Sequence, residues 1–321
     1  MMLEVLLQPW PAFFGLVIFL FAIDLLFGSR GNDLRTAALW SAIWVGAGLI
    51  FGFWIWATQG GDVATAYYTA YVLEKSLSID NVFVFVLIFS ELRIPASQQH
   101  RVLLMGIIGA LVMRAAMIWL GVYLLARFHW VIYPFAALLL IAALRLLYGE
   151  SAERRIVKDS CAACGTWVAW FIPVTPTGEG QRFLLRESGK LVATPMLVAL
   201  ILIETTDLIF ALDSIPAVLA ISRDPYVVYT SNIFAMLGLR AIYFVLADVV
   251  QRFHYLRAGL AVILCFVAAK MLSTEAIDIP IGLSLIVIVG IMLFAVAASL
   301  LFPKPGRVQA RSKTPIPIDP P

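Results

Sequence analysis

The chain alternates between long apolar stretches and short polar connections, a pattern that predicts a row of membrane-spanning helices. A bilayer core needs about 20 apolar residues in each helix. Nine stretches meet this length or come near it: 9–27, 38–57, 69–90, 102–125, 130–148, 191–220, 226–249, 258–273 and 280–302. The first has no basic segment before it, so we interpret it as a spanning helix and not as a cleavable signal peptide.

The composition supports an all-α, polytopic membrane fold. Hydrophobic residues make up 62% of the 321 positions and charged residues 13%, against roughly 25% charged residues in a typical soluble domain. We therefore expect one membrane domain over 1–302, with a polar loop at about 149–190. A Pro-rich tail at 303–321 is expected to be disordered.

The positions of Lys and Arg predict the orientation, because cytoplasmic loops are enriched in these residues. With the N-terminus outside, the inside loops and the tail hold most of them, including Arg257 ahead of the eighth stretch. The outside loops hold Arg127 and Arg223, and Lys270 lies near a helix end. We therefore expect the N-terminus outside, and the C-terminus and the loop 149–190 in the cytoplasm.

Polar landmarks recur in two regions of the chain and indicate an internal repeat. Each region has a pair of acidic residues six positions apart, and a small polar residue follows the second acid. Each unit, 69–148 or 191–273, contains three predicted helices, so the second would cross the membrane in the opposite sense. Inverted repeats of this kind are typical of secondary transporters. The matching landmarks are Glu74/Asp207, Asp80/Asp213, Arg114/Arg240 and Arg145/Lys270.

Charged residues within or at the edge of the predicted helices are the strongest functional signal, because a charge at the bilayer centre costs about 2.5–3.5 kcal/mol on insertion scales. Six acids against three bases leave a formal surplus of three negative charges, which a bound divalent cation or protonation would offset. The acids are Asp24, Glu74, Asp80, Glu204, Asp207 and Asp213, and the bases are Lys75, Arg114 and Arg240.

Carboxylates favour hard cations such as Mg²⁺, Ca²⁺ and Mn²⁺, which prefer oxygen ligands. We predict a metal site formed by five acids: Glu74, Asp80, Glu204, Asp207 and Asp213. Further oxygens for the site are expected from Asn81, Ser214, Asn232 and Asp24, the last of which is alternatively a solvated residue at a helix end. The predicted spans contain no His and only Cys265, which disfavours a thiolate site for zinc or copper. These side chains do not choose between Mn²⁺ and Mg²⁺.

The three bases have a structural interpretation as charge partners of the acids: Lys75, Arg114 and Arg240. Residues six positions apart differ by about 120° around an ideal helix, so Glu74 and Asp80 would diverge on a straight one. We therefore hypothesise that the helices bearing Asp80 and Asp213 are distorted near these acids.

Several function classes are disfavoured. The chain has no Gly-rich phosphate loop, no Ser-His-Asp arrangement and no basic nucleic-acid patch. We therefore predict that the protein is not an enzyme and has no catalytic residue, no resident cofactor and no nucleic-acid partner. Cys161 and Cys164 form a single CxxC pair in the polar loop, which is weak evidence for a metal or redox role.

Three segments closely resemble the TerC family of integral membrane proteins, in particular its Alx-type members: YVLEKSLSIDNVFVFVLIFSEL, LILIETTDLIFALDSIPAVLAISRDP and YTSNIFAMLGLRAIYF. The resemblance covers about 10–300. It implies a fold like that of the LysE transporter superfamily and a function in manganese export. It also implies that Glu74, Asp80, Glu204, Asp207 and Asp213 are the intramembrane acids of the family.

The sequence and the resemblance together lead to one expected function: export of a divalent cation, Mn²⁺ above others, across the cytoplasmic (inner) membrane of a bacterium by alternating access. Mn²⁺ is then the substrate, and the lipid bilayer is the other expected partner. Two alternatives stay open: a non-transporting scaffold of a stress-response or secretion complex, or a transporter of Ca²⁺ or Mg²⁺. The oligomeric state and the coupling ion are not predicted.

Overall fold

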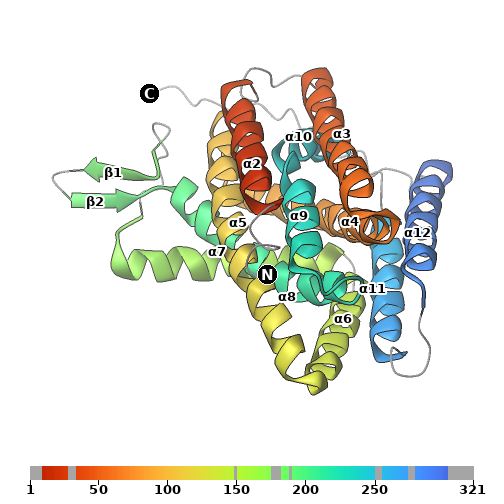
Figure 1. The fold of residues 1–321 in the computed structure, drawn as a ribbon. Helices are drawn as coiled ribbons and strands as arrows, with labels where there is room; N and C mark the ends of the chain where they lie inside the picture. The colour runs from red at the N-terminus through yellow and green to blue at the C-terminus, as the bar shows by residue number, and fades with distance from the viewer. Residues whose placement is uncertain are drawn as a thin grey trace, which may run out of the picture.

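A computed structural model describes residues 9–27, 34–147, 150–174, 182–187, 190–249, 255–273 and 279–302. These residues form helices and one small hairpin (Figure 1). The elements are α2 (Pro9–Phe27), α3 (Leu34–Gln59), α4 (Gly61–Glu91), α5 (Ala96–Arg127), η1 (His129–Val131), α6 (Ile132–Leu147), α7 (Glu150–Phe171), β1 (Leu184–Glu187), β2 (Lys190–Ala193), α8 (Pro195–Leu219), α9 (Pro225–Met236), α10 (Leu239–Val249), α11 (Leu256–Ser273) and α12 (Ile281–Leu301).

The polytopic helical membrane fold predicted from the sequence is confirmed. Six of the described helices are long and apolar enough to cross a membrane, and the bent pair α9–α10, taken as one span, makes seven. Large apolar side chains such as Ile50, Trp119 and Phe294 are 70–76% exposed, as expected of a lipid-facing surface. The count of nine spans stays a prediction.

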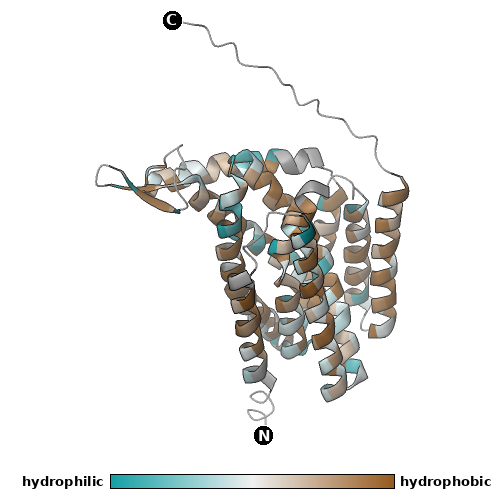
Figure 2. Cartoon of the chain, turned by 90° about the horizontal axis from the view of Figure 1, so that it is seen from above, coloured by the Kyte–Doolittle hydropathy of each residue, from teal (hydrophilic) through white to brown (hydrophobic). Residues whose placement is uncertain are grey.

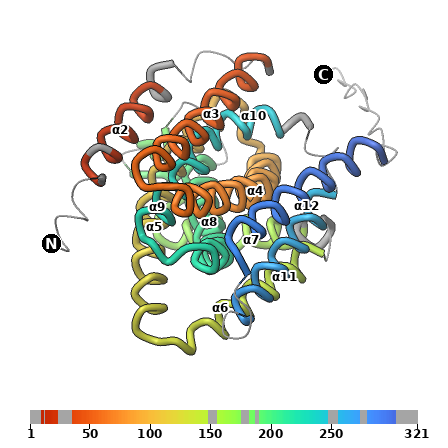
Figure 3. The backbone as a smooth tube through the Cα atoms, turned by 45° about the vertical axis from the view of Figure 1, so that its right-hand side comes forward, coloured from red at the N-terminus to blue at the C-terminus, as the bar shows by residue number. Residues whose placement is uncertain are grey.

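The charged helix α4 is largely buried against other helices, and Figure 3 shows it running between α3 and α12. It packs against α3, α8, α9, α10 and α12, and Glu74 is completely buried within these contacts. Neighbouring helices therefore separate the Glu74 carboxylate from lipid, as is usual for ionisable residues within the spans of a membrane protein.

The packing partners follow the order that the predicted repeat requires. In the predicted repeat, α4, α5 and α6 of the first unit correspond to α8, α9–α10 and α11 of the second. A contact between α4 and α9 should therefore have a counterpart between α8 and α5. Both contacts are extensive, and α6 packs against its counterpart α11. Such packing is expected of an inverted repeat, which itself stays a prediction.

A break separates α9 from α10, where the sequence predicted one continuous helix at 226–249. The two helices meet at an angle of 42°. Gly238 lies at the break with a φ of 80°, a conformation that costs glycine little. A Cβ atom there would also lie 2.6 Å from Trp44 Cγ, so the backbone approaches α3 too closely for a side chain.

The predicted loop 149–190 contains regular structure. The helix α7 lies across one end of the bundle and packs against α4 and α8, and the strands β1 and β2 pair antiparallel beyond it (Figure 2). The predicted helix at 191–220 begins later than expected, at Pro195, because 190–193 form β2. The predicted tail at 303–321 lies outside the described residues.

Candidate functional site

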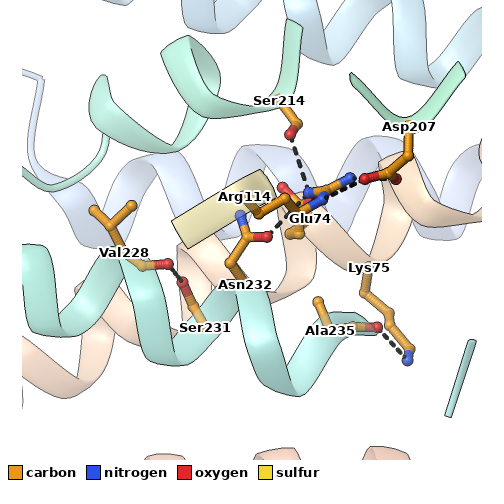
Figure 4. A network of polar contacts seen from close by, with 9 residues as sticks. All are labelled: Glu74, Lys75, Arg114, Asp207, Ser214, Val228, Ser231, Asn232 and Ala235. Atoms are coloured by element: carbon orange, nitrogen blue, oxygen red, sulfur yellow. Dashed lines mark hydrogen bonds and ion pairs between the residues drawn. The ribbon is translucent and has the colours of Figure 1, made fainter. Parts of the chain in front are cut away.

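The guanidinium of Arg114 on α5 lies at the centre of a buried polar cluster (Figure 4). It donates to both carboxylate oxygens of Asp207 on α8, with Nη2–Oδ1 and Nε–Oδ2 distances of 3.1 and 3.3 Å. It also forms an ion pair with Glu74 on α4. Arg suits this position because its planar fork matches carboxylates with two parallel hydrogen bonds. Arg114, predicted as a charge partner of the acids, thus forms ion pairs with Glu74 and Asp207.

Two neutral side chains complete the cluster. Arg114 Nη1 lies 3.0 Å from Asn232 Oδ1 on α9 and 3.2 Å from Ser214 Oγ on α8. The cluster thus joins α4, α5, α8 and α9 in the interior. Its two carboxylates exceed its single guanidinium by one formal negative charge.

Lys75 has a different partner from its neighbour Glu74. Its Nζ donates to the carbonyl oxygen of Ala235 at 2.9 Å (Figure 4). It also donates to the carbonyl oxygen of Leu237 at 3.3 Å. These carbonyls lie at the break between α9 and α10, where the last turn of a helix leaves acceptors without intrahelical partners. Lys75 therefore stabilises the broken helix, a structural role that the sequence predicted only in general terms.

A cavity of about 550 Å³ adjoins the Arg114 cluster. Asp80 and Asn81 of α4 line it, as do Asp213 and Ser214 of α8. The corresponding motifs of the two predicted repeat units thus face one space. The rest of the wall is mostly apolar and comes from α4, α6, α7, α8 and α11.

Two arginines that the sequence analysis did not assign to the site also line this cavity: Arg145 of α6 and Arg257 of α11. Arg257 Nε lies 3.3 Å from Asp80 Oδ1, and its guanidinium lies 3.9 Å above the Phe83 ring. The sequence placed Arg257 in a polar loop because it precedes the apolar stretch. The aromatic ring three residues after Asp80 is the signal that could have suggested a cation nearby.

These arginines correct the predicted charge balance. Around the cluster and the cavity, Glu74, Asp80, Asp207 and Asp213 contribute four negative charges. The four bases Lys75, Arg114, Arg145 and Arg257 contribute four positive charges. This smaller set is formally balanced. Adding Arg145 and Arg257 to the six acids and three bases of the prediction leaves a surplus of one negative charge, because bases from the helix ends reach the interior.

Other predicted site residues lie apart from the cavity. The Glu204 carboxylate packs against the backbone of α5 at Gly109, where a Cβ atom would overlap it. Arg240 Nη1 lies 3.0 Å from His100 Nε2. Asp24 belongs to α2, but its side chain lies outside the described part of the chain. The described residues include no group of three or more His, Cys, Asp and Glu side chains placed to hold one metal ion, so the five-acid metal site stays a prediction.

Neither of the two helices that were predicted to be distorted is interrupted at its acid. Both α4 and α8 are continuous through Asp80 and Asp213, although α8 contains Pro216. Because α4 is continuous, Glu74 and Asp80 face different neighbours: Glu74 contacts Arg114, and Asp80 contacts Arg257.

Comparison with known proteins identifies the family. A family model described as the integral membrane protein TerC family matches residues 59–307. This chain belongs to the TerC family. The resemblance noted in the sequence is thereby confirmed, and both acidic motifs lie inside the matched region.

Curated TerC relatives align over most of the chain. An uncharacterized membrane protein of Myxococcus xanthus is 44% identical over 295 residues, which cover 91% of this chain and 92% of the relative. A protein of Escherichia coli K12 named putative membrane-bound redox modulator Alx is 42% identical, with 88% and 91% covered. An uncharacterized membrane protein of Rickettsia bellii is 38% identical, with 92% and 97% covered. No solved structure matches.

The CxxC pair of this TerC protein lies on α7. Cys161 is buried and Cys164 half-buried, and neither forms a disulfide. Burial raises the pKa of the Cys161 thiol to about 11, and the negative charge of Glu91 acts in the same direction. Burial raises the pKa of Cys164 as well. Both thiols are therefore protonated near neutral pH, which disfavours reaction as nucleophiles.

Proposed function

We propose that this TerC family protein exports a divalent metal cation, with Mn²⁺ as its substrate, across the bacterial cytoplasmic membrane. The observation that carries the proposal is the shared cavity: Asp80 with Asn81 and Asp213 with Ser214 approach it from α4 and α8. Intramembrane acids that face a cavity are typical of ion pathways. The choice of Mn²⁺ rests on the family resemblance.

The chemistry of the cavity supports a hard cation. Its polar lining offers carboxylate, amide and hydroxyl oxygens, and none of the described residues that line it is a Cys or His. A volume of about 550 Å³ also leaves room for a cation together with water ligands, since one water takes roughly 30 Å³ in the liquid. Small hard cations keep several waters when carboxylates bind them.

The Arg114 cluster has a positioning role in this proposal. It holds α4, α5, α8 and α9 together through side chains that are almost completely buried. Both acidic motifs lie on helices of the cluster, so it fixes the positions of Asp80 and Asp213 at the wall of the cavity. Transport would then proceed by movement between the two proposed repeat units, with the N-terminus outside and the C-terminus in the cytoplasm.

The proposal is tested with protein reconstituted into sealed vesicles loaded with Mn²⁺. We expect Asp80→Asn and Asp213→Asn each to reduce Mn²⁺ flux at least tenfold, because each removes one anionic ligand. The matched control is Asp62→Asn, an exposed acid in the first turn of α4, which should transport like the wild type. Equal flux in all four proteins would refute the proposal.

The same vesicles address the two alternatives. If Mg²⁺ or Ca²⁺ inhibits Mn²⁺ flux at concentrations similar to that of Mn²⁺, the protein is still a transporter, but its substrate is Mg²⁺ or Ca²⁺. No flux of any divalent cation through folded wild-type protein would favour the scaffold instead.

A further inference from the structure

Arg257 has an arrangement unlike that of Arg114. Both guanidinium groups contact acids of the two repeated motifs. Arg114 and its partners Glu74 and Asp207 are at most 3% exposed. The side chains of Arg257 and Asp80 are 17% and 12% exposed and line the cavity. Arg257 is therefore a cation at the wall of the proposed transport site, where a substrate could reach it.

Arg114 contacts Asp207 through both Nε and Nη2, whereas the Arg257–Asp80 contact is made through Nε. Its Nε–Oδ1 distance is 3.3 Å, whereas charge-assisted N–H···O hydrogen bonds are usually about 2.7–2.9 Å long. Another contact of the guanidinium, with the Phe83 ring at 3.9 Å, does not involve the carboxylate. A cation–π contact of this kind would hold the arginine beside the cavity while the carboxylate binds something else.

Electrostatics makes Arg257 and a metal dication competitors. A divalent cation bound by Asp80 would lie next to the guanidinium, and like charges at such a distance repel strongly in a low-dielectric interior. Conversely, an unoccupied Asp80 without Arg257 would leave a carboxylate uncompensated inside the membrane domain, which is costly. An ionised Asp80 therefore favours one of the two cations as its partner, and both together are disfavoured.

We propose that Arg257 is an internal counter-cation: it neutralises Asp80 when the cavity holds no substrate and leaves the carboxylate when a divalent cation binds. This inference rests on the proposed function. Its consequence is that the empty carrier has a neutral site and reorients without a second transported ion at Asp80. Arg257 is thus a positioning residue for the reorientation of the empty carrier. It also competes with the substrate cation for the Asp80 carboxylate.

The test compares Arg257→Gln with the wild type, and Arg127→Gln, at the exposed end of α5, is the matched control. Mn²⁺ binding to purified full-length protein is measured by titration calorimetry, and net Mn²⁺ efflux and Mn²⁺–Mn²⁺ exchange are measured in proteoliposomes. We expect Arg257→Gln to bind Mn²⁺ at least tenfold more tightly, because the competitor is gone. Net efflux should fall at least tenfold, whereas exchange, which does not use the empty carrier, should stay within about twofold of the wild type.

Two further variants keep the test decisive. Arg257→Lys retains the charge and should bind Mn²⁺ within about threefold of the wild type. Arg257→Met removes the charge but keeps an apolar chain against Phe83, and it replaces Arg257→Gln should that variant fail to fold.

Each result has a distinct meaning. The inference is overturned if the neutral variants bind Mn²⁺ with unchanged or weaker affinity, or if they lose exchange and net efflux in parallel. Arg257 then has only a structural role, and the proposed function still stands. If the folded wild type binds and transports no divalent cation, the proposed function fails and the inference fails with it.

Discussion

Arg114 of α5 and Asp207 of α8 form a two-pronged pair in the membrane interior, with nitrogen–oxygen distances of 3.1 and 3.3 Å. Both side chains are at most 3% exposed. The pair links the first acidic position of the second motif to a helix of the other predicted repeat unit. A charge buried this deeply is tolerated only together with its partners.

Removing the guanidinium should therefore destabilise the protein severely. Arg114→Ala leaves the carboxylates of Glu74 and Asp207 buried without a counter-charge, and breaking such a pair costs about 3–5 kcal/mol. We expect a large drop in the thermal unfolding midpoint of the detergent-purified protein. The exposed Arg127→Ala should change stability by no more than about 0.5 kcal/mol. A melting curve of Arg114→Ala that overlays the wild type would show that the cluster contributes little.

The break between α9 and α10 should not tolerate a side chain. Gly238→Ala places a Cβ atom against Trp44 and requires a positive φ that alanine disfavours. A strained position of this kind costs about 1–3 kcal/mol, and we expect a corresponding loss of thermal stability. Gly290→Ala on α12, where a Cβ atom meets nothing within 4 Å, is the control and should be neutral or slightly stabilising. Equal effects of the two variants would argue against the tight contact with α3.

Gly109 and Glu204 should be energetically coupled. Gly109→Ala forces the Glu204 carboxylate away from α5, because the new methyl group would overlap it. Glu204→Ala removes that conflict, so the double variant should be more stable than the sum of the single effects predicts. Contacting residues typically show coupling energies of about 0.5–3 kcal/mol in such a cycle. Additive effects in thermal unfolding would place the carboxylate elsewhere.

The thiols of α7 should react slowly at neutral pH. The pKa of Cys161 is raised to about 11, so the thiolate is scarce at pH 7 and increases as the pH approaches that value. Alkylation of Cys161 by iodoacetamide, followed by mass spectrometry, should accelerate continuously from pH 7 to pH 10. The Cys161→Ser variant, which lacks this thiol, shows which alkylated peptide comes from Cys161. A rate that is already maximal at pH 7 would reveal an activated thiol and would favour a redox role for the pair.

The exposed aromatic face of α7 should lie in the membrane interface. Trp167, Trp170 and Phe171 are 58–82% exposed at helical spacing, whereas Lys158 lies elsewhere around the same helix. Aromatic side chains gather where a membrane meets water. In a background without native cysteines, a nitroxide at Trp170→Cys should be relaxed more by oxygen, and one at Lys158→Cys more by a water-soluble nickel chelate. Equal nickel accessibility at both positions would place the aromatic face in water.

The sequence determined the class of the protein and most of the residues of interest. Long apolar stretches predict spanning helices because each must satisfy its own backbone hydrogen bonds in lipid. Acids inside such stretches stand out for the same reason, so Glu74, Asp80, Asp207 and Asp213 could be recognised without a fold. The motifs also indicated the TerC family, which the comparisons confirm. All of these signals are local in the chain.

Only the tertiary structure decided which charges meet. The packing of α11 against α4 brings Arg257, which the sequence placed in a loop, to Asp80, and the continuity of α4 separates Asp80 from Glu74. The break at Gly238 likewise depends on the close approach of Trp44 from α3. Hydropathy and motif spacing report the environment that each segment needs. They do not report how helices rotate and pack against one another, and that packing determines that two acids share a cavity while two others share an arginine.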